Sequence, residues 1–598
     1  MRFLTIYFDM QLKKVNEMGT IFSGKGSLAL SVTAVLLASA FGTPALPGGL
    51  ENLLPGPSVA WADPLVDRPQ SYDPGVQLNQ TREYLERQRI AQQMAEDEAK
   101  RKARVETDSQ KPEEASAQVS FTLAGVNTDP SEILTDEEIR GVTDPYIGKT
   151  VSLQDLYEIT GALNKLYAEK GFAVCRSYLP PQRIHEGQVQ IKFMEGKTGK
   201  VTVQGLRFTR EGYVTHRVPL KAGQVANTDR LNRDLQRFNA TNDVQLRIMV
   251  HAGEQPETTD YEIVAFEPEK NHVFTLYTDN YGYDTSGRWR EGIFYTMRSL
   301  TGQRDALRLS YLRSKGTDVF GSSYTLPVNN KGTLLDIDYG TNSTELIKGQ
   351  MAENLGIKGH SYAASLTLRH PLRVDQNRRD EIGLQYLHQK SVTDWGTKTK
   401  ARDTLSDDVR NAYVPYISFT HYGNSSVFYH RHKFPYVNYN GRGDSRDSYL
   451  NYQIDALYQK RYGGGQMLSA RFSGQIAGGN KRMSSADRFY IGGSNTVRGY
   501  EESYVGGNKG FAASIAYQLP VNKQRTLNAF SFFDFGRVYP NKLEGLNKTL
   551  VSTGLGLSAS YKNLYASLTL GIPLKRNFEN QSDKPGKTRI DFNCSYTF

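Results

Sequence analysis

Residues 588–598, TRIDFNCSYTF, end the chain with an apolar side chain at every second position. Side chains along a strand point alternately to opposite faces, so these apolar residues share one face. A final strand of this kind, closing on an aromatic residue, is typical of barrels of the bacterial outer membrane. The residues on the shared face are Ile590, Phe592, Cys594, Tyr596 and Phe598.

Residues 270–598 carry the same pattern further back along the chain. Short alternating segments, such as 305–313, 333–339 and 362–369, are separated by polar or glycine-rich turns. Sixteen strands with their connections would take about 21 residues each, which suits spanning strands of ~9–11 residues. We therefore predict a transmembrane β-barrel of about sixteen antiparallel strands over 270–598. A soluble β-sandwich is the alternative, and the ending of the chain disfavours it.

The composition agrees with a barrel and excludes other classes. Of the 598 residues, 38% are hydrophobic, and the mean hydropathy is −0.54. A polytopic helical transporter is excluded, because each span needs ~20 apolar residues and only one such stretch exists. Aromatic residues make up 11% of the chain, which excludes disorder throughout. The net charge of +10 suits contact with anionic lipopolysaccharide, or charges inside a lumen, better than nucleic acid.

Residues 1–62 are predicted to be a secretory signal. An apolar run at 27–42 follows three lysines, as in the first two regions of a signal peptide. Sites of the A-x-A type end at Ala40 and at Ala62. We favour the second, because the mature chain then starts in a polar, proline-rich stretch; an uncleaved anchor is the alternative. The protein is therefore expected to be exported.

Residues 63–117 are predicted to hold a polar helix, at about 76–106, and a linker, at 107–117. The helical stretch lacks Gly and Pro and is rich in residues of high helix propensity. Ion pairs such as Glu83 with Arg87 are spaced four residues apart with the acid first, the better orientation. No apolar stripe runs along the helix, so it either lies in water or fills a wet channel. A solvated linker is the alternative.

Two small α+β modules are predicted at 118–196 and 197–269. In the first, Ser152 begins a capping box for a helix over 152–169, and strands follow at 172–178 and 187–194. A small sheet leaves an unpaired edge that an extended chain can join. We expect strand 172–178 and helix 152–169 to form that edge and groove. The second module repeats the order in shortened form, with elements at 200–208, 226–238, 243–251 and 260–266.

Two motifs stand in the C-terminal part of the chain. The first reads RFYIGGSNTVRGY at 488–500, and the second reads FFDFG at 532–536. Five candidate strands follow the first motif. In a sixteen-strand count, the first motif therefore lies between strands eleven and twelve, and the second lies on strand thirteen. The five strands are expected at about 509–519, 527–536, 551–559, 563–572 and 588–597.

These residues carry a resemblance to a known family. The run Tyr178-Leu179-Pro180-Pro181-Gln182, followed by Gly187 and Glu195-Gly196, resembles the paired POTRA domains of two-partner secretion translocators. The string at 488–500 resembles the loop-six signature of the POTRA-plus-barrel superfamily, in which the loop folds back into the lumen. Here that loop would span about 478–507. Over 76–598 the chain is similar to the haemolysin activation/secretion family (ShlB/FhaC/HecB).

The resemblance implies a lumenal site. Arg498 of the loop would face Asp534 on the barrel wall, with Phe532 packing and Gly536 giving room. A guanidinium in a narrow lumen needs a charged, planar partner. The loop residues that the resemblance implies are Gly492, Gly493, Val497, Arg498, Gly499 and Tyr500.

The resemblance also implies a function. Such a protein lies in the outer membrane of a diderm bacterium, where barrel-assembly machinery would insert it among lipid and lipopolysaccharide, with its POTRA domains in the periplasm. Those domains would receive an unfolded exoprotein, a large β-helical adhesin, haemolysin or toxin, which crosses the pore without ATP. The polar helix would plug the resting pore. The residues expected to bind the exoprotein are Phe172, Val174, Arg176 and Tyr178.

Alternatives are an outer-membrane β-barrel assembly factor of the same superfamily, a substrate-specific porin and an exported adhesive β protein. We predict no enzymatic activity, no cofactor and no nucleic-acid partner. His421, His430 and His432 cluster without the spacing of a metal site, so no metal is predicted. Cys175 and Cys594 are interpreted as isolated cysteines.

Overall fold

The computed structural model describes most of the chain beyond residue 72. The predicted signal, over 1–62, and the linker, over 107–117, lie outside the described residues. The expected helix is present as α3 (Pro74–Lys102). None of the helices in the described ranges is long and apolar enough to cross a membrane. The described residues are 73–102, 120–172, 174–255, 257–349, 355–375, 377–396, 403–442, 445–478, 482–540, 547–576 and 588–598.

The first module is an α+β unit whose helix α5 (Leu153–Glu169) packs on a small sheet. The predicted capping box is confirmed, because Ser152 and Asp155 each accept a hydrogen bond from the other's backbone. Strands β2, β5 and β4 form the sheet in that order, so β4 (Arg176–Tyr178) is an edge strand. The other elements are β1 (Ser120–Thr122), β2 (Gly125–Thr128), α4 (Asp136–Thr143), η1 (Asp144–Tyr146), β3 (Thr150–Ser152) and β5 (Gln188–Met194).

The edge strand β4 is shorter than predicted. The chain leaves α5 through Gly171 at a positive φ of 83°, and Cys175 N–H then bonds to the Phe172 carbonyl at 2.9 Å in a turn. Extended pairing therefore begins at Arg176, and Phe172 packs against the module's core instead. Cys175 is buried, and both it and Cys594 are free thiols.

The second module repeats this design. Its sheet has the order β6-β8-β7, so β8 is central and β6 and β7 are edge strands. Helix α7 begins after Asn227, whose side chain accepts from Arg230 N–H, and buries Leu231 and Phe238 against the sheet. The elements are β6 (Lys197–Gln204), α6 (Glu211–Thr215), α7 (Thr228–Thr241), β7 (Gln245–Ala252) and β8 (Thr258–Phe266).

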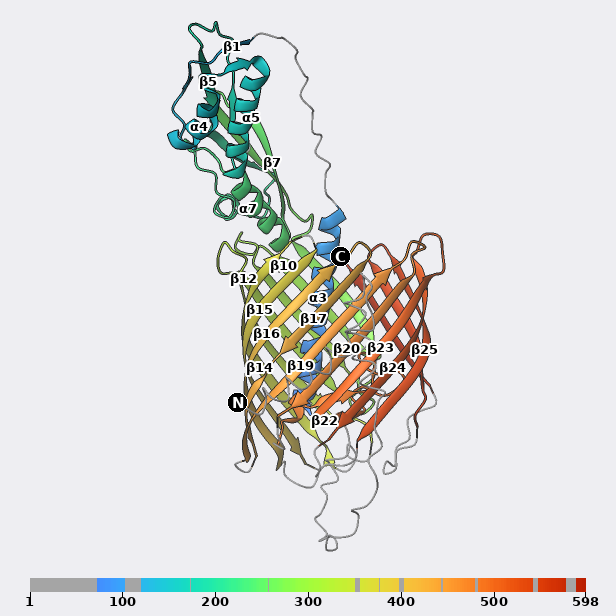
Figure 1. Ribbon diagram of the computed structural model, residues 1–598. Helices are drawn as coiled ribbons and strands as arrows, with labels where there is room; N and C mark the ends of the chain where they lie inside the picture. The colour runs from blue at the N-terminus through green and yellow to red at the C-terminus, as the bar shows by residue number, and fades with distance from the viewer. Residues whose placement is uncertain are drawn as a thin grey trace, which may run out of the picture. The chain divides into compact units, whose positions relative to one another are not determined.

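A closed antiparallel barrel follows (Figure 1). It is sealed where β27 (Arg589–Thr597) pairs with β9 (His272–Asp279). Strands β17 and β18 together occupy one position between β16 and β19. The break falls at Phe434-Pro435, since proline cannot donate to the ladder. Counted over the described residues, the barrel therefore has sixteen strand positions, as predicted.

The barrel strands have the following bounds: β9 (His272–Asp279), β10 (Arg290–Arg298), β11 (Ala306–Ser314), β12 (Thr317–Pro327), β13 (Leu334–Glu345), β14 (Lys358–Val374), β15 (Arg378–Trp395), β16 (Asp403–Tyr422), β17 (Ser426–Lys433), β18 (Tyr436–Gly441), β19 (Ser445–Arg461), β20 (Met467–Ala477), β23 (Lys509–Pro520), β24 (Leu527–Tyr539), β25 (Lys548–Tyr561), β26 (Leu564–Pro573) and β27 (Arg589–Thr597).

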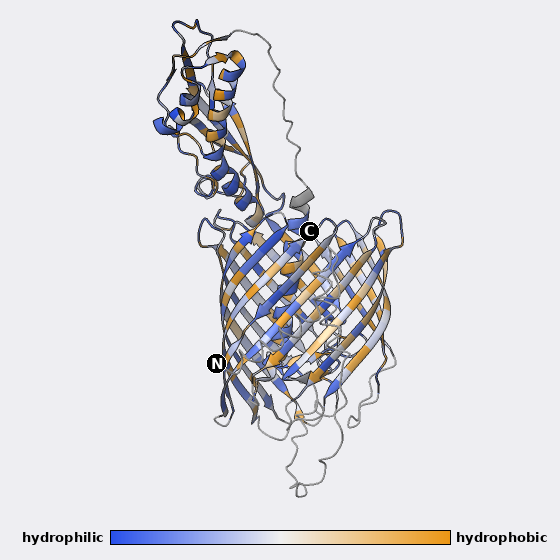
Figure 2. Cartoon of the chain, viewed as in Figure 1, coloured by the Kyte–Doolittle hydropathy of each residue, from blue (hydrophilic) through white to orange (hydrophobic). Residues whose placement is uncertain are grey.

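The wall alternates between an apolar outer face and a polar inner face. On β14, Tyr362, Leu366 and Leu368 are exposed on the outside, whereas Ser365 and Thr367 are buried toward the lumen. Figure 2 shows the same alternation of hydrophobic and hydrophilic residues along the strands. The pattern is that of a barrel whose outer face meets lipid.

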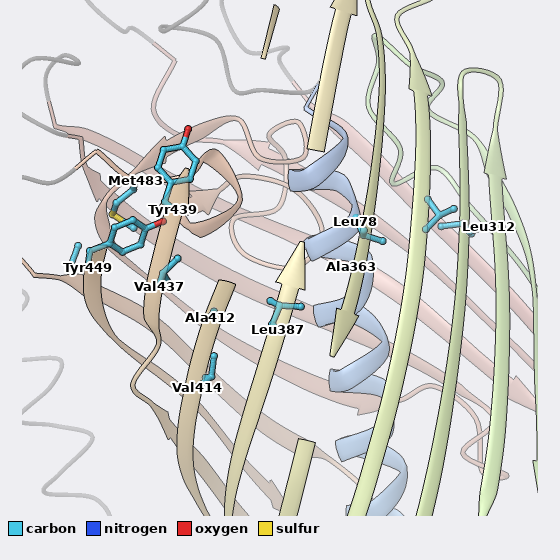
Figure 3. Packing of buried hydrophobic residues seen from close by; sticks show 12 residues of the cluster. Leu78, Leu312, Ala363, Leu387, Ala412, Val414, Val437, Tyr439, Tyr449 and Met483 are labelled. Atoms are coloured by element: carbon cyan, nitrogen blue, oxygen red, sulfur yellow. The ribbon is translucent and has the colours of Figure 1, made fainter. Parts of the chain in front are cut away.

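Helix α3 runs through the lumen. Its one deeply buried leucine, Leu78, lies against Ala363 of the wall (Figure 3). The helix also makes hydrogen bonds and ion pairs with the wall along its length, as expected for a helix without an apolar stripe.

Candidate functional site

The return loop, defined as residues 482–508, connects β20 to β23. Its stem is a small hairpin in which β21 (Phe489–Ile491) pairs with β22 (Val505–Gly507). The motif residues 492–500 form the tip. Gly492 and Gly493 have φ angles of 112° and 92°, a region that side-chain-bearing residues rarely adopt, so the tight turn of the tip depends on these glycines.

Arg498 at the tip contacts Asp534 on β24. Its Nε and Nη2 donate to the two carboxylate oxygens at 2.8 and 2.7 Å, and its backbone N–H donates to the same carboxylate at 3.0 Å. The guanidinium lies 3.5 Å from the ring centre of Phe532, a cation–π contact. The structure thus brings together the three residues expected to interact. Asp534 has no exposed surface.

Sequence reasoning missed Ser514 on β23, whose hydroxyl accepts a 2.9 Å hydrogen bond from Arg498 Nη2. Ser514 is the register partner of Asp534 on the neighbouring strand. The strand register, had it been known, would have identified it.

The other motif residues pack the tip onto the wall. A Cβ at Gly536 would lie 2.9 Å from Val497 and 3.1 Å from Ile491, so Gly536 provides the room expected of it. Tyr500 is 1% exposed, and its hydroxyl lies 3.0 and 2.7 Å from the carbonyls of Val551 and Lys575. The loop is therefore fixed by apolar packing as well as by charge.

A second close approach joins Gly499 of the tip to Gly571 on β26. A Cβ at Gly499 would lie 2.9 Å from the Gly571 carbonyl carbon, and a Cβ at Gly571 would lie 2.5 Å from the Gly499 nitrogen. Gly499 also has a φ of 89°. Backbone meets backbone here, so neither position has room for a side chain. Gly571 carries no local sequence signal of this contact.

Helix α3 touches both the return loop and the wall. Asn79 Nδ2 donates to the Ala486 carbonyl at 2.7 Å, and Gln80 bonds to Ser503, both on the loop. Ion pairs then follow the helix along the lumen. They join Arg89 to Asp336, Glu86 to Arg431 and Lys433, Asp97 to Arg379, and Glu98 to Arg461.

The edge of the first module is partly occupied by its own side chain. Ser177 in β4 donates its N–H to Asn164 Oδ1 at 2.6 Å and accepts from Asn164 Nδ2 at 3.3 Å. Helix α5 thus supplies an amide where another strand would pair. Of the expected exoprotein-binding residues, Val174, Arg176 and Tyr178 are exposed, whereas Phe172 is turned to the core.

The histidines lie outside this site. His430 and His432 hydrogen-bond to each other at 2.9 Å on β17. In the described residues, no group of three or more histidines, cysteines and carboxylates is arranged to hold a metal ion.

Comparison with known proteins identifies the family. The model of the ShlB-type POTRA domain matches residues 121–196, and that of the haemolysin secretion/activation protein ShlB/FhaC/HecB matches residues 258–559. The chain belongs to the ShlB/FhaC/HecB family. It is thus a two-partner secretion transporter, with its barrel in the outer membrane and its POTRA domains in the periplasm.

Relatives in this family include named transporters. The heme/hemopexin transporter protein HuxB of Haemophilus influenzae is 23% identical over 476 residues, which cover 75% of this chain and 82% of HuxB. The outer membrane transporter CdiB of Dickeya dadantii is 21% identical over 506 residues, covering 76% of this chain and 83% of CdiB.

Solved structures share the fold. CdiB from Escherichia coli superposes with a TM-score of 0.64 at 17% identity, covering 88% of this chain and 99% of that one. CdiB from Acinetobacter baumannii gives a TM-score of 0.59 at 18% identity, with the same coverage. Both likenesses concern the fold alone.

Proposed function

We propose that this transporter captures an unfolded exoprotein with its two periplasmic modules and passes it through the barrel pore without ATP. The observation that carries the proposal is that helix α3 occupies the lumen through polar contacts. Such contacts can be exchanged for contacts with water, so a helix held in this way can leave the lumen. A lumen packed by an apolar plug would not reopen so readily.

The exoprotein would be a large β-helical adhesin, haemolysin or toxin that the first module holds by strand addition at β4, where its backbone would displace the Asn164 amide from Ser177. Pairing with backbone groups tolerates many sequences, which suits an unfolded cargo. Folding of the exoprotein outside the cell would then bias its movement outward. The apolar outer wall supports contact with lipid and lipopolysaccharide, and barrel-assembly machinery would insert the protein.

Arg498 would hold the return loop in the lumen and keep the path shaped for transport. The contacts with Asp534 and Ser514 support this role, because stripping one partner from a buried ion pair costs ~3–5 kcal/mol. The loop in turn contacts helix α3 at Asn79 and Gln80. Loop and helix would therefore respond to each other during opening.

The experiment is a quantitative comparison of the culture-medium and outer-membrane proteomes with and without this gene. Loss of one large exoprotein from the medium, with the outer membrane otherwise unchanged, supports dedicated secretion and names the cargo. Broad loss of barrel proteins from the membrane would favour an assembly factor instead. No change in either fraction would favour a porin.

A further inference from the structure

Two wall arginines contact both helix α3 and the second module. Arg379, at the start of β15, donates to Asp97 of the helix at 2.9 and 3.0 Å and also to the carbonyl of Ala240 in α7. Arg298, at the end of β10, lies 3.7 Å from Glu96 of the helix and 3.9 Å from Asp243. Each of these two arginines therefore contacts both helix α3 and the second module.

The second module is fixed at the same place by a contact that does not involve the helix. Asp243, just after α7, receives a bidentate pair of hydrogen bonds from Arg304 in the β10–β11 turn. The Arg304 side chain is 3% exposed. Arg304 therefore helps to hold this part of the second module against the wall.

The geometry around Arg379 makes the two contacts interdependent. Its Nη2 donates to both Asp97 and Ala240, and Asp97 also accepts from the Tyr422 hydroxyl at 2.7 Å. If α7 moved away, an N–H group of a largely buried guanidinium would lose its acceptor, which is costly. The guanidinium would then turn toward water, and its alignment with Asp97 would be lost.

We propose that Arg379, assisted by Arg298, couples the seating of helix α3 to the docking of the second module against the barrel. When an exoprotein engages the modules, it displaces α7. The contacts of Arg379 with Asp97 and of Arg298 with Glu96 then weaken, and the helix can leave the lumen. Coupling is reciprocal, so departure of the helix also loosens α7. The inference rests on the proposed function, in which α3 closes the pore.

The test measures helix seating directly, in the full-length protein in membranes. A Met94→Cys substitution places a thiol on a position of α3 that is buried while the helix is seated, so its rate of reaction with a bulky maleimide reports how often the helix leaves. The same reaction without the substitution gives the background from the two native cysteines. Heat-modifiability on gels checks that each barrel is folded.

Asp243→Asn and Arg304→Gln change the contact that docks the second module against the barrel. Asp97→Asn changes the contact between Arg379 and helix α3. We expect each substitution to raise the labelling rate. The increase should fall within the range of about 5- to 150-fold that is typical of allosteric coupling. Asp243→Asn should add little in the presence of Asp97→Asn, because both break one relay. Arg373→Gln is the matched control, since Arg373 pairs with Asp375 in its own rim turn, and it should leave the rate unchanged.

The coupling would be overturned if Asp243→Asn and Arg304→Gln were labelled at the rate of the parent protein. It would also be overturned if the double variant of Asp243→Asn and Asp97→Asn raised the rate by the product of the two single effects. The pore-closing role of α3 is judged separately, by the conductance of a variant lacking the helix. The labelling rate reports seating whether or not the seated helix blocks ions. Failure of the coupling and failure of the proposed function are therefore distinguishable.

Discussion

Arg498 and Asp534 form two parallel hydrogen bonds across the gap between the return loop and the wall, at 2.8 and 2.7 Å. The loop supplies the cation and β24 supplies the anion, so the pair forms only when the loop lies against this part of the wall. A bidentate arginine–carboxylate pair is geometrically demanding. Lysine would not reproduce it.

Arg498→Ala should sharply reduce secretion while the barrel stays in the membrane, because the buried Asp534 loses its charged partner at a cost of ~3–5 kcal/mol. The measurement is exoprotein in the medium against barrel in outer-membrane fractions. Arg498→Lys should restore little. Export at the parent level in Arg498→Ala would contradict the role given to the pair.

Gly499→Ala should displace the loop tip, because the new methyl group would overlap the backbone of Gly571 and the backbone there has a positive φ. We expect faster protease cleavage within 482–508 and reduced secretion. Gly463→Ala is the control, since a Cβ at Gly463 meets nothing within 4 Å. Equal cleavage rates in both variants would show that the contact does not hold the loop.

Deletion of 74–102 should raise the conductance of the protein in a planar bilayer, because the polar helix would no longer occupy the lumen. The expected change is a larger and more persistent open current. A deletion variant that is folded but conducts like the parent would rule out closure by α3.

Tyr178→Ser should lower exoprotein secretion several-fold if the cargo binds along β4. Tyr178 is 40% exposed, and Ile147, at 42%, is equally exposed outside the sheet that contains β4. Ile147→Ser is therefore the matched control for the loss of an exposed apolar side chain. Equal secretion by the two variants would argue against the β4 edge.

Burial raises the pKa of the Cys175 thiol from 9.0 to about 12, and nearby Glu195 adds to the shift. Since the thiolate is the reactive form, Cys175 should be alkylated at pH 8.5 far more slowly in the folded protein than after denaturation. Mass spectrometry of the peptide containing residue 175 measures both rates.

The same shift predicts a pH effect on the first module. Well below pH 9 the thiol is protonated in both states. Between about pH 9 and 12 the unfolded chain loses a proton that the folded module keeps, so stability falls as pH rises through that window. Rapid alkylation of the folded protein would contradict this.

Much of the fold could be predicted because it depends on sequence patterns that repeat or occur within a few residues. The alternation in 588–598 predicted an outer-membrane barrel, and Ser152 predicted the start of a helix. The placement of Asp534 on the thirteenth strand position followed from counting strands after the motif, and the structure has it there. These signals are local, so one sequence contains them.

The remaining features depend on which strands and modules meet, and a single sequence does not encode that locally. Nothing in the local sequence distinguishes Gly571 from other strand glycines, because its contact with Gly499 exists only in the assembled barrel. Asn164 is a helix residue until β4 begins late enough for Ser177 to face it. Arg379 joins segments that are 282 and 139 residues away along the chain.

The lumenal contacts of helix α3 have a consequence for the cell's permeability barrier. The helix precedes the barrel in the chain, and its ion pairs reach strands from β10 to β19. We expect a newly inserted copy to close around its own N-terminal segment. Each protein would then enter the membrane already shut, so the cell could make many copies without admitting antibiotics that the outer membrane normally keeps out.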